Sequence, residues 1–369
     1  MAPEVVDLNA KDVSMEWEQN IPYLEHPYFS SRPIKKGDDI FVGELGFEGE
    51  NKQLIESFSR AIAKESFAEG KSKTDSLLIS YKGKLVFESY YRRGRQNVPH
   101  FQMSITKSYT AFALGRAIQL GYLSMDDLNK PVVSFLTKLD PLKLCAGAEK
   151  ITLAEALNMT SGIKLINDKM KNYKTHPERL KGQLQAQAYL ACSEQIPAAP
   201  RKFSYQPADP ALIMQVLESV VPGTAKDFIE RELMGKMGII NYSWQLDTSG
   251  LPKSAAGSSF TSRDMIKVGT MVLQNGKWKG EQLIPKKFIK RAFSPITLSY
   301  GSNFYGYFCW YQDIRVGDLI IPCFQLRGAL GQYTFIFPKQ ELVVVSTGHG
   351  AMGPMLGDIS QKILPAFIQ

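Results

Sequence analysis

Cysteine and histidine are scarce in this chain: its 369 residues include four of each. No two cysteines show C-x-x-C spacing and none has a histidine pair nearby, so the pattern argues against a metal site. Four cysteines are also too few for a disulfide scaffold in a chain of this length. We therefore expect no metal site. The residues concerned are Cys145, Cys192, Cys309, Cys323, His26, His100, His176 and His349.

Several localisation and catalytic signatures are also missing. No apolar run approaches the roughly 18 residues that cross a bilayer, so no membrane span is predicted. The segment from Met1 to Asp7 has neither the basic start nor the apolar stretch of a signal peptide. This start fits a cytoplasmic enzyme, or a periplasmic or secreted one whose export signal was removed. Without G-x-S-x-G, a Ser-His-Asp elbow is not supported.

The positive charge is modest and spread out. A net charge of +8 arises from 44 basic and 36 acidic residues. Lys-rich pieces such as 71–73 and 286–287 are typical of solvated surface rather than of nucleic-acid sites. We expect a small-molecule partner and no nucleic acid, while the oligomeric state stays open. An apolar content of 44% in a chain of this length allows a large core.

The order of the expected elements predicts an α+β fold. Strands near both ends enclose a long stretch, 104–237, that has helical and loop patterns, which predicts an antiparallel sheet flanked by terminal helices with an all-helical domain inserted. The expected units are an arm over 1–50, a discontinuous sheet domain over 51–100 and 240–369, and a helical domain over 101–239, with the active site in the cleft between the domains. Helices are expected over 51–68 and 355–367, and strands over 76–81, 84–90, 304–312, 319–325, 333–337 and 342–346.

The tetrapeptide Ser104-Ile105-Thr106-Lys107 places a hydroxyl and an amine one helical turn apart. The apolar run that follows ends at Gly121 and predicts a buried helix. In its first turn, Ser104 gains free backbone N–H groups and the positive end of the helix dipole, which stabilise developing negative charge. Lys107 could hold or receive the hydroxyl proton. Alternatively, Ser104 is only an N-cap and Lys107 a solvated side chain; nearby His100 could line the site, although a lone histidine is more often structural.

The surrounding segments resemble a known superfamily. Residues 99–108 resemble the nucleophile segment of the serine β-lactamase and penicillin-binding-protein superfamily, in which S-x-x-K is a signature. Residues 151–162 are similar to the stretch that follows the nucleophile helix, and 262–265 and 275–278 to a later helix and its turn. The chain is therefore identified as a member over about residues 75–350. The resemblance implies a β-lactamase-like fold and a serine hydrolase that works without a cofactor.

A second motif of the superfamily, Tyr-x-Asn, falls on residues 203–218. Tyr205 matches the tyrosine, but Pro207 stands at the asparagine position. This form is closer to family VIII carboxylesterases and 6-aminohexanoate-dimer hydrolases than to true β-lactamases. The resemblance implies that Tyr205 accepts the proton in acylation and returns it to the leaving group, with Lys107 as a nearby cation that lowers the phenol pKa. Tyr205 could also be a buried aromatic without a role, and Asp209 is expected to cap the next helix.

The third motif, K-T-G, is matched by Leu326-Arg327-Gly328. Leu326 replaces the lysine that recognises a β-lactam carboxylate. Gly328 would let a substrate approach the strand closely. The resemblance implies an oxyanion hole made of the backbone N–H groups of Ser104 and Ala329. Arg327 either contacts substrate or points away, because neighbouring strand residues alternate between faces.

These residues predict the hydrolysis of a carboxylic ester through an acyl-enzyme on Ser104. Amide hydrolysis of the β-lactamase, D-aminopeptidase or 6-aminohexanoate-dimer hydrolase type is an alternative. An alternative of another class is a penicillin-binding or sensor module that is acylated without turnover, or an inactive scaffold. Deacylation distinguishes these classes, and the sequence identifies neither the residue that positions the second water nor the natural substrate.

Overall fold

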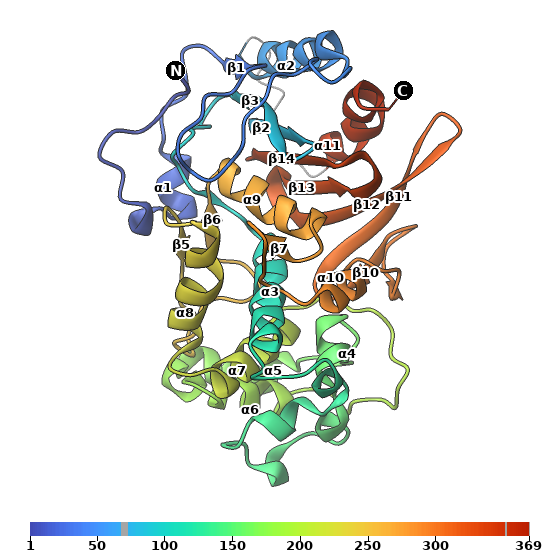
Figure 1. Ribbon diagram of the computed structural model, residues 1–369. Helices are drawn as coiled ribbons and strands as arrows, with labels where there is room; N and C mark the ends of the chain where they lie inside the picture. Colours follow the sequence, from blue (N-terminus) through green and yellow to red (C-terminus); the bar gives the residue numbers. More distant parts are fainter. Residues whose placement is uncertain (68–72, 351–352, 369) are drawn as a thin grey trace.

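A nine-stranded antiparallel sheet organises the computed structural model, which describes residues 1–67, 73–350 and 353–368 (Figure 1). The strand order is β1-β3-β2-β14-β13-β12-β11-β10-β9, so both ends of the chain meet where β2 pairs with β14. The strands are β1 (Tyr28–Ser30), β2 (Thr74–Tyr81), β3 (Lys84–Tyr90), β9 (Thr297–Leu298), β10 (Phe304–Gly306), β11 (Cys309–Val316), β12 (Leu319–Gly328), β13 (Gln332–Phe337) and β14 (Leu342–Gly348).

Helices cover both faces of the sheet's centre. Along β14, Val343 and Val345 join the core that contains α9 (Ser262–Leu273), whereas Leu342 and Val344 join the core that contains α2 (Lys52–Phe67) and the C-terminal helices. Successive side chains of a strand point to opposite faces, so a strand buried on both faces is apolar throughout. The C-terminal helices are α11 (Gly353–Asp358), a π-helical turn (Ile359–Ile363) and a 3₁₀ turn (Leu364–Ala366).

A helical region lies beside the sheet. Between residues 102 and 242, all of which the structure describes, the regular elements are helices, and Figure 1 shows them gathered below the sheet. The longest is α3 (Ile105–Gln119), which contacts both α7 and β12 and is buried from Ile105 to Ile118. A helix apolar on every side belongs in a core. The others include α4 (Leu153–Leu157), α5 (Asn167–Thr175), α6 (Leu184–Ala191), α7 (Ala208–Val220) and α8 (Ala225–Phe228).

The N-terminal arm has more regular structure than its sequence suggests. It contains α1 (Met15–Gln19), and its β1 covers the edge of β3. Arg263 of α9 anchors the arm: its guanidinium binds Glu88 of β3 at 2.7 and 2.8 Å and Asp38 of the arm at 2.9 Å. The Arg263 and Glu88 side chains are buried, so this pairing is protected from screening by solvent.

Two predicted elements differ in detail. The strand expected over 304–312 is a hairpin of β10 and β11, because Tyr307 and Phe308 adopt positive φ angles of 47° and 61°. Both central residues of a tight type I′ hairpin need positive φ. The helix expected over 355–367 divides into three helical pieces around Pro365, which has no N–H to donate. Ala68 and the pair Lys71 and Ser72 lie outside the described residues.

The predicted fold class is confirmed: an antiparallel sheet with flanking terminal helices and an inserted helical region. The boundaries at residues 50, 100 and 239 stay predictions. In the parts of the chain that the structure describes, no helix is long and apolar enough to cross a bilayer. Three short strands, β4 (His100–Phe101), β5 (Ser243–Trp244) and β6 (Ser258–Phe260), form a small sheet from which α3 begins.

Candidate active site

Ser104 stands at the junction of β4 and α3, where the chain turns sharply. Met103 has a φ of +49°, a conformation uncommon for a residue with a side chain, and the turn leaves Ser104 half-buried. Ser104 occupies the N-cap position, but its hydroxyl makes no capping hydrogen bond. Among the described residues, its backbone N–H also has no acceptor. The role of a simple N-cap therefore leaves this hydroxyl unexplained.

Lys107 is buried beside Ser104 rather than solvated. Its Nζ lies 3.0 Å from Ser104 Oγ and donates to the Ala255 carbonyl oxygen at 2.8 Å, and the residue is only 5% exposed. Within the described parts of the chain, no carboxylate pairs with it. Burial lowers the pKa of Lys107 to about 8. An amine with such a pKa is partly neutral near pH 7 and can accept a proton.

Tyr205 approaches Ser104 from the loop before α7. Its side chain interacts with Ser104, and Lys107 Nζ lies 4.7 Å from the centre of its ring. Burial raises the pKa of Tyr205 to about 12, and the interaction with Ser104 lowers it only in part. The expectation that Lys107 lowers this pKa is wrong, because the amine lies over the ring face and burial dominates. Near neutral pH, Tyr205 is therefore a proton donor.

Aromatic rings pack around Tyr205. The ring centres of Tyr305 and Trp310 each lie 6.0 Å from that of Tyr205, and the ring centre of Phe203 lies 6.3 Å away. Tyr300 stacks against Trp310 and is largely exposed. Sequence reasoning missed these rings because aromatic residues in strands usually signal only core packing. They give the site an apolar wall.

Gly328 lies against the segment that leads to Ser104. A β-carbon at this position would lie 2.3 Å from the Gln102 carbonyl oxygen and 3.2 Å from the Met103 β-carbon. The space that glycine leaves is thus filled by the turn before Ser104. Ala329 follows directly, half-buried, at the start of a 3₁₀ turn that ends at Gly331. The end of β12 and the start of α3 are therefore brought together as expected for two parts of one site.

Arg327 and Leu326 point to opposite faces of β12, because successive side chains of a strand alternate between its faces. Its Nη2 donates to Asn303 at 2.8 Å and to Gln312 at 2.9 Å, and the guanidinium lies 4.8 Å from the centre of the Trp310 ring. Burial lowers its pKa to about 10. No carboxylate of the described residues pairs with Arg327. The cation is therefore held by neutral oxygens against the Trp310 ring, while Leu326 is part of the core.

Asp209 does not cap α7, contrary to the prediction. It lies inside the first turn, with Pro207 in the N-cap position. Both carboxylate oxygens are buried without a hydrogen-bond partner of good geometry in the described structure. Burial raises the pKa of Asp209 to about 8, and Ser161 and Gln206 offset this only in part. The carboxyl group is therefore mainly protonated near pH 7.

His100 is buried among charged groups, which fits a structural role for this residue. Its ring nitrogens lie within ion-pair distance of Glu18 and Asp75, and its ring centre lies 5.1 Å from that of His349. The sequence suggested scattered histidines, but the fold brings His100 and His349 together with Glu18 as potential metal ligands. The expectation of no metal site stays a prediction.

Comparison with known proteins places the chain in a family. The family model described as Beta-lactamase matches residues 58–352. An uncharacterized protein of Alkalihalophilus pseudofirmus is 25% identical over 293 residues, which are 73% of this chain and 82% of that protein.

Solved structures share the fold. A protein of Bacillus anthracis, provisionally named a 6-aminohexanoate-dimer hydrolase, superposes with a TM-score of 0.67 at 17% identity, over 99% of this chain and 97% of the other. A class C β-lactamase gives a TM-score of 0.66 at 14% identity, over 87% and 98% of the two chains. At this identity the likeness concerns the fold alone. Because the family model covers most of its length, the chain belongs to the Beta-lactamase family, within the superfamily of serine β-lactamases and penicillin-binding proteins.

Proposed function

We propose that this protein hydrolyses carboxylic esters, with Ser104 as the nucleophile. The observation that carries the proposal is the 3.0 Å contact between Ser104 Oγ and the amine of Lys107, whose pKa burial lowers to about 8. The neutral amine is a base within hydrogen-bond reach of the proton that it must remove.

In acylation, the Ser104 hydroxyl proton passes to Lys107 as Oγ bonds to the ester carbonyl carbon. The backbone N–H groups of Ser104 and Ala329 donate to the resulting oxyanion. When the C–O bond to the alcohol breaks, the leaving oxygen takes the proton of Tyr205. The Lys107 ammonium then returns its proton to the phenolate. Lys107 is thus the base and Tyr205 the acid, which reverses the acylation role inferred for Tyr205 from the sequence.

Deacylation repeats these steps with water. The water proton passes to neutral Lys107 as the oxygen attacks the acyl carbon, and Ser104 Oγ leaves with a proton from Tyr205. The carboxylic acid is released, and the proton on Lys107 restores the phenol. Because the same groups serve both halves of the cycle, turnover requires no further titratable residue.

The surroundings favour an ester over a β-lactam. Leu326 is fully buried in the core and Pro207 has no side-chain amide, so the two positions offer no polar contact to a β-lactam carboxylate or amide. Losing one charge-assisted hydrogen bond typically costs about 1.5–3 kcal/mol, or roughly ten- to a hundredfold in binding. An apolar acyl chain needs neither contact and fits the aromatic wall around Tyr205.

Amide hydrolysis is the second candidate, and Arg327 is the observation that favours it. A buried guanidinium held only by neutral oxygens could exchange one of them for a substrate carboxylate. The 6-aminohexanoate-dimer name of the structurally similar Bacillus anthracis protein refers to an amide of this kind.

An activity panel distinguishes the candidates. Short- and long-chain nitrophenyl esters, nitrocefin, a D-alanyl amide and the 6-aminohexanoate dimer are compared on the wild type, Ser104→Ala and the matched control Ser204→Ala, which alters an exposed serine beside Tyr205. We expect kcat/KM for a short ester to exceed that for nitrocefin by several powers of ten. Ser104→Ala should lose this activity and Ser204→Ala should keep it.

Covalent labelling provides the second readout. After treatment with a fluorophosphonate, peptide mass analysis should place the adduct on Ser104. An adduct on another serine, or full turnover by Ser104→Ala, contradicts the mechanism. Equal efficiency on an amide substrate supports the second candidate. One equivalent of released product without turnover supports an acylated sensor module.

A further inference from the structure

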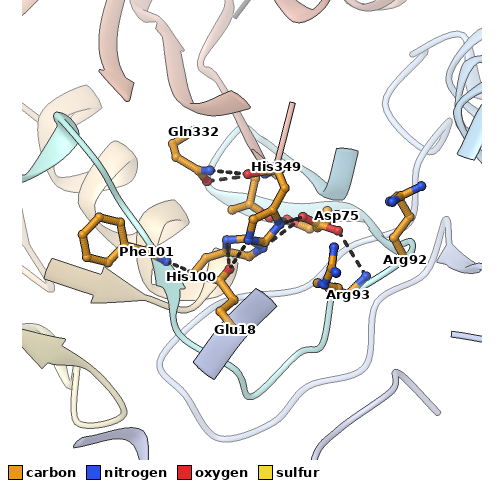
Figure 2. A network of polar contacts seen from close by, with 12 residues as sticks. Glu18, Asp75, Arg92, Arg93, His100, Phe101, Gln332 and His349 are labelled. Atoms are coloured by element: carbon orange, nitrogen blue, oxygen red, sulfur yellow. Dashed lines mark hydrogen bonds and ion pairs between the residues drawn. The ribbon is translucent and has the colours of Figure 1, made fainter. Parts of the chain in front are cut away.

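Four side chains from distant parts of the sequence gather beside the small sheet (Figure 2). Glu18 comes from α1, Asp75 from β2, His100 from β4, and His349 directly follows β14. The fold thus joins the arm, the sheet and the segment that leads to Ser104 at one point. One potential ligand atom each from Glu18, His100 and His349 lie within 4.8 Å of one another.

Asp75 completes the group. Its Oδ2 lies 2.6 Å from His349 Nδ1 and 3.5 Å from His100 Nε2. Glu18 Oε1 contacts His100 Nδ1 and lies 3.6 Å from His349 Nε2. Glu18 and Asp75 therefore face opposite nitrogens of each ring, so Glu18 and one nitrogen of each histidine form a compact set of three donors, and Asp75 contacts the other nitrogen of each ring.

The other oxygen of each carboxylate is fixed by the backbone. The Phe101 N–H donates to Glu18 Oε2 at 2.9 Å, and the Arg93 N–H donates to Asp75 Oδ1 at 3.1 Å. Hydrogen bonds of this kind orient carboxylate ligands in metal sites. They hold Glu18 Oε1 and Asp75 Oδ2 pointing into the cluster, as Figure 2 shows.

The donors are buried and incompletely satisfied. The side chains of Glu18 and Asp75 are 1% exposed, that of His100 5% and that of His349 12%. Glu18 Oε1 and both His100 ring nitrogens have no hydrogen bond of good geometry in the described structure, although they lie within ion-pair distance of one another and of Asp75. Polar atoms buried in this way are costly unless a partner is present.

The charge of the cluster admits a divalent cation. In the described parts of the chain, no Lys or Arg side chain is ion-paired with either carboxylate; Arg92 and Arg93 instead bind Tyr23. Despite its burial, the pKa of His100 is raised to about 10 by Glu18 and Asp75, so without an ion its protonated ring offsets part of the charge of the two carboxylates. A divalent cation that displaces this proton offsets the charge of both. Imidazole nitrogen together with carboxylate oxygen is a donor set that Zn²⁺ accepts in four-coordinate sites.

We propose that Glu18, His100 and His349 bind one Zn²⁺ ion, while Asp75 holds the two histidine rings from the other side. Each histidine supplies the ring nitrogen that faces Glu18, and Glu18 supplies the oxygen that faces the two rings. Three protein ligands leave one coordination position for a water molecule.

The proposed ion would fix both segments that build the hydrolase site. His100 lies in β4, directly before the turn to Ser104. On the other side, the Gln332 side chain donates to the Gly348 carbonyl oxygen beside His349, and β13, to which Gln332 belongs, follows the turn that contains Ala329. The proposal does not depend on the reaction that Ser104 performs.

Metal titration tests the proposal on the full-length protein. After removal of metals with a chelator, ZnCl₂ is titrated in competition with a chromophoric chelator, and CoCl₂ is added separately to record the visible spectrum. We expect one tight equivalent of Zn²⁺, the absorption of tetrahedral Co²⁺, and a melting temperature that rises with Zn²⁺. His349→Ala and the isosteric Glu18→Gln should each weaken Zn²⁺ binding at least tenfold.

His176→Ala is the matched control, because His176 is exposed and pairs with Glu178 on the surface. It should bind Zn²⁺ like the wild type. Circular dichroism checks each variant for folding; if His349→Ala fails to fold, Glu18→Gln and the wild-type Co²⁺ spectrum decide. No uptake by the folded wild type, an octahedral Co²⁺ spectrum, or unchanged affinity in Glu18→Gln overturns the proposal and leaves a cluster balanced by protonated imidazoles.

Discussion

The Gln102 carbonyl oxygen occupies the space beside Gly328 so closely that a β-carbon on Gly328 would lie only 2.3 Å from it. Gln102 precedes Ser104 by two residues, and Gly328 precedes Ala329. This contact therefore fixes the distance between the nucleophile and the proposed oxyanion donor at the end of β12. The φ of Gly328 is −123°, which any residue can adopt, so space rather than backbone conformation requires glycine here.

Gly328→Ala should lower ester kcat/KM about a hundredfold, the order of loss expected when catalytic groups move by about 1 Å. The added methyl group must displace the backbone at Gln102 or the end of β12. The matched control is Gly357→Ala, an exposed position in α11 where a β-carbon meets nothing within 4 Å. Kinetics and melting temperature are measured for both variants. Wild-type activity in Gly328→Ala would show that this contact does not position Ser104.

Lys107→Ala and Tyr205→Phe should each lower kcat by about 10²–10⁴-fold, the usual range for removing a general acid or base. Both side chains interact with Ser104, and they also contact each other. Groups that act as a unit show strongly non-additive effects. The double variant should therefore be little slower than the slower single variant. If the double variant lost the product of the two single effects, Lys107 and Tyr205 would act independently rather than as a unit.

The pH dependence follows from the pKa of Lys107, which burial lowers to about 8. The base must be deprotonated, so kcat/KM for an ester should fall as pH drops through about 8 and level off above it. Tyr205, with a pKa raised to about 12, stays protonated, and no descending limb is expected below about pH 11. Tyr205→Phe should keep the ascending limb. A flat profile between about pH 6 and 9 contradicts the assignment of Lys107.

The sequence predicted the parts of the site that depend on local structure. Ser104 and Lys107 lie one helical turn apart, and the apolar run after them required a buried helix, so their contact followed from spacing alone. The alternating and apolar runs also identified the central strands. The edge strand β1 was missed because Tyr28–Ser30 pairs with β3 only through a contact with a distant part of the chain.

Properties that depend on tertiary contacts were predicted less well. The identity of Gly328 was noticed, but the Gln102 oxygen that requires it comes from a distant part of the chain, just after β4. The direction of the Tyr205 pKa depends on how deeply the ring is buried, which motif spacing does not give. His100 and His349 seemed unrelated because only the tertiary fold brings β4 of the small sheet and the end of β14 of the large sheet together.

The last prediction concerns the cost of holding Lys107 in this place. Burial lowers its pKa from 10.5 to about 8, and no carboxylate of the described residues compensates. At about 1.4 kcal/mol for each pH unit, the charged amine destabilises the folded state by about 3 kcal/mol near pH 7. Lys107→Met removes the charge and keeps the length, so it should raise the free energy of unfolding by up to that amount while abolishing ester turnover. Function and stability are opposed in this way at many active sites.

The sign of the pH effect makes this prediction specific. Below about pH 8 the amine is charged in both states and the full penalty applies. Between about pH 8 and 10.5 it is neutral only in the folded state, so wild-type stability rises with pH and the advantage of Lys107→Met shrinks. Urea unfolding near pH 7 and pH 10 measures the free energy of unfolding of the wild type and of Lys107→Met at each pH.

Lys267→Met is the contrasting control. Lys267 is equally buried but pairs with Asp264 at 2.9 Å, so its removal should destabilise the protein. Lower stability of Lys107→Met than of the wild type at pH 7 would show that its contacts with Ser104 and Ala255 outweigh the cost of its burial.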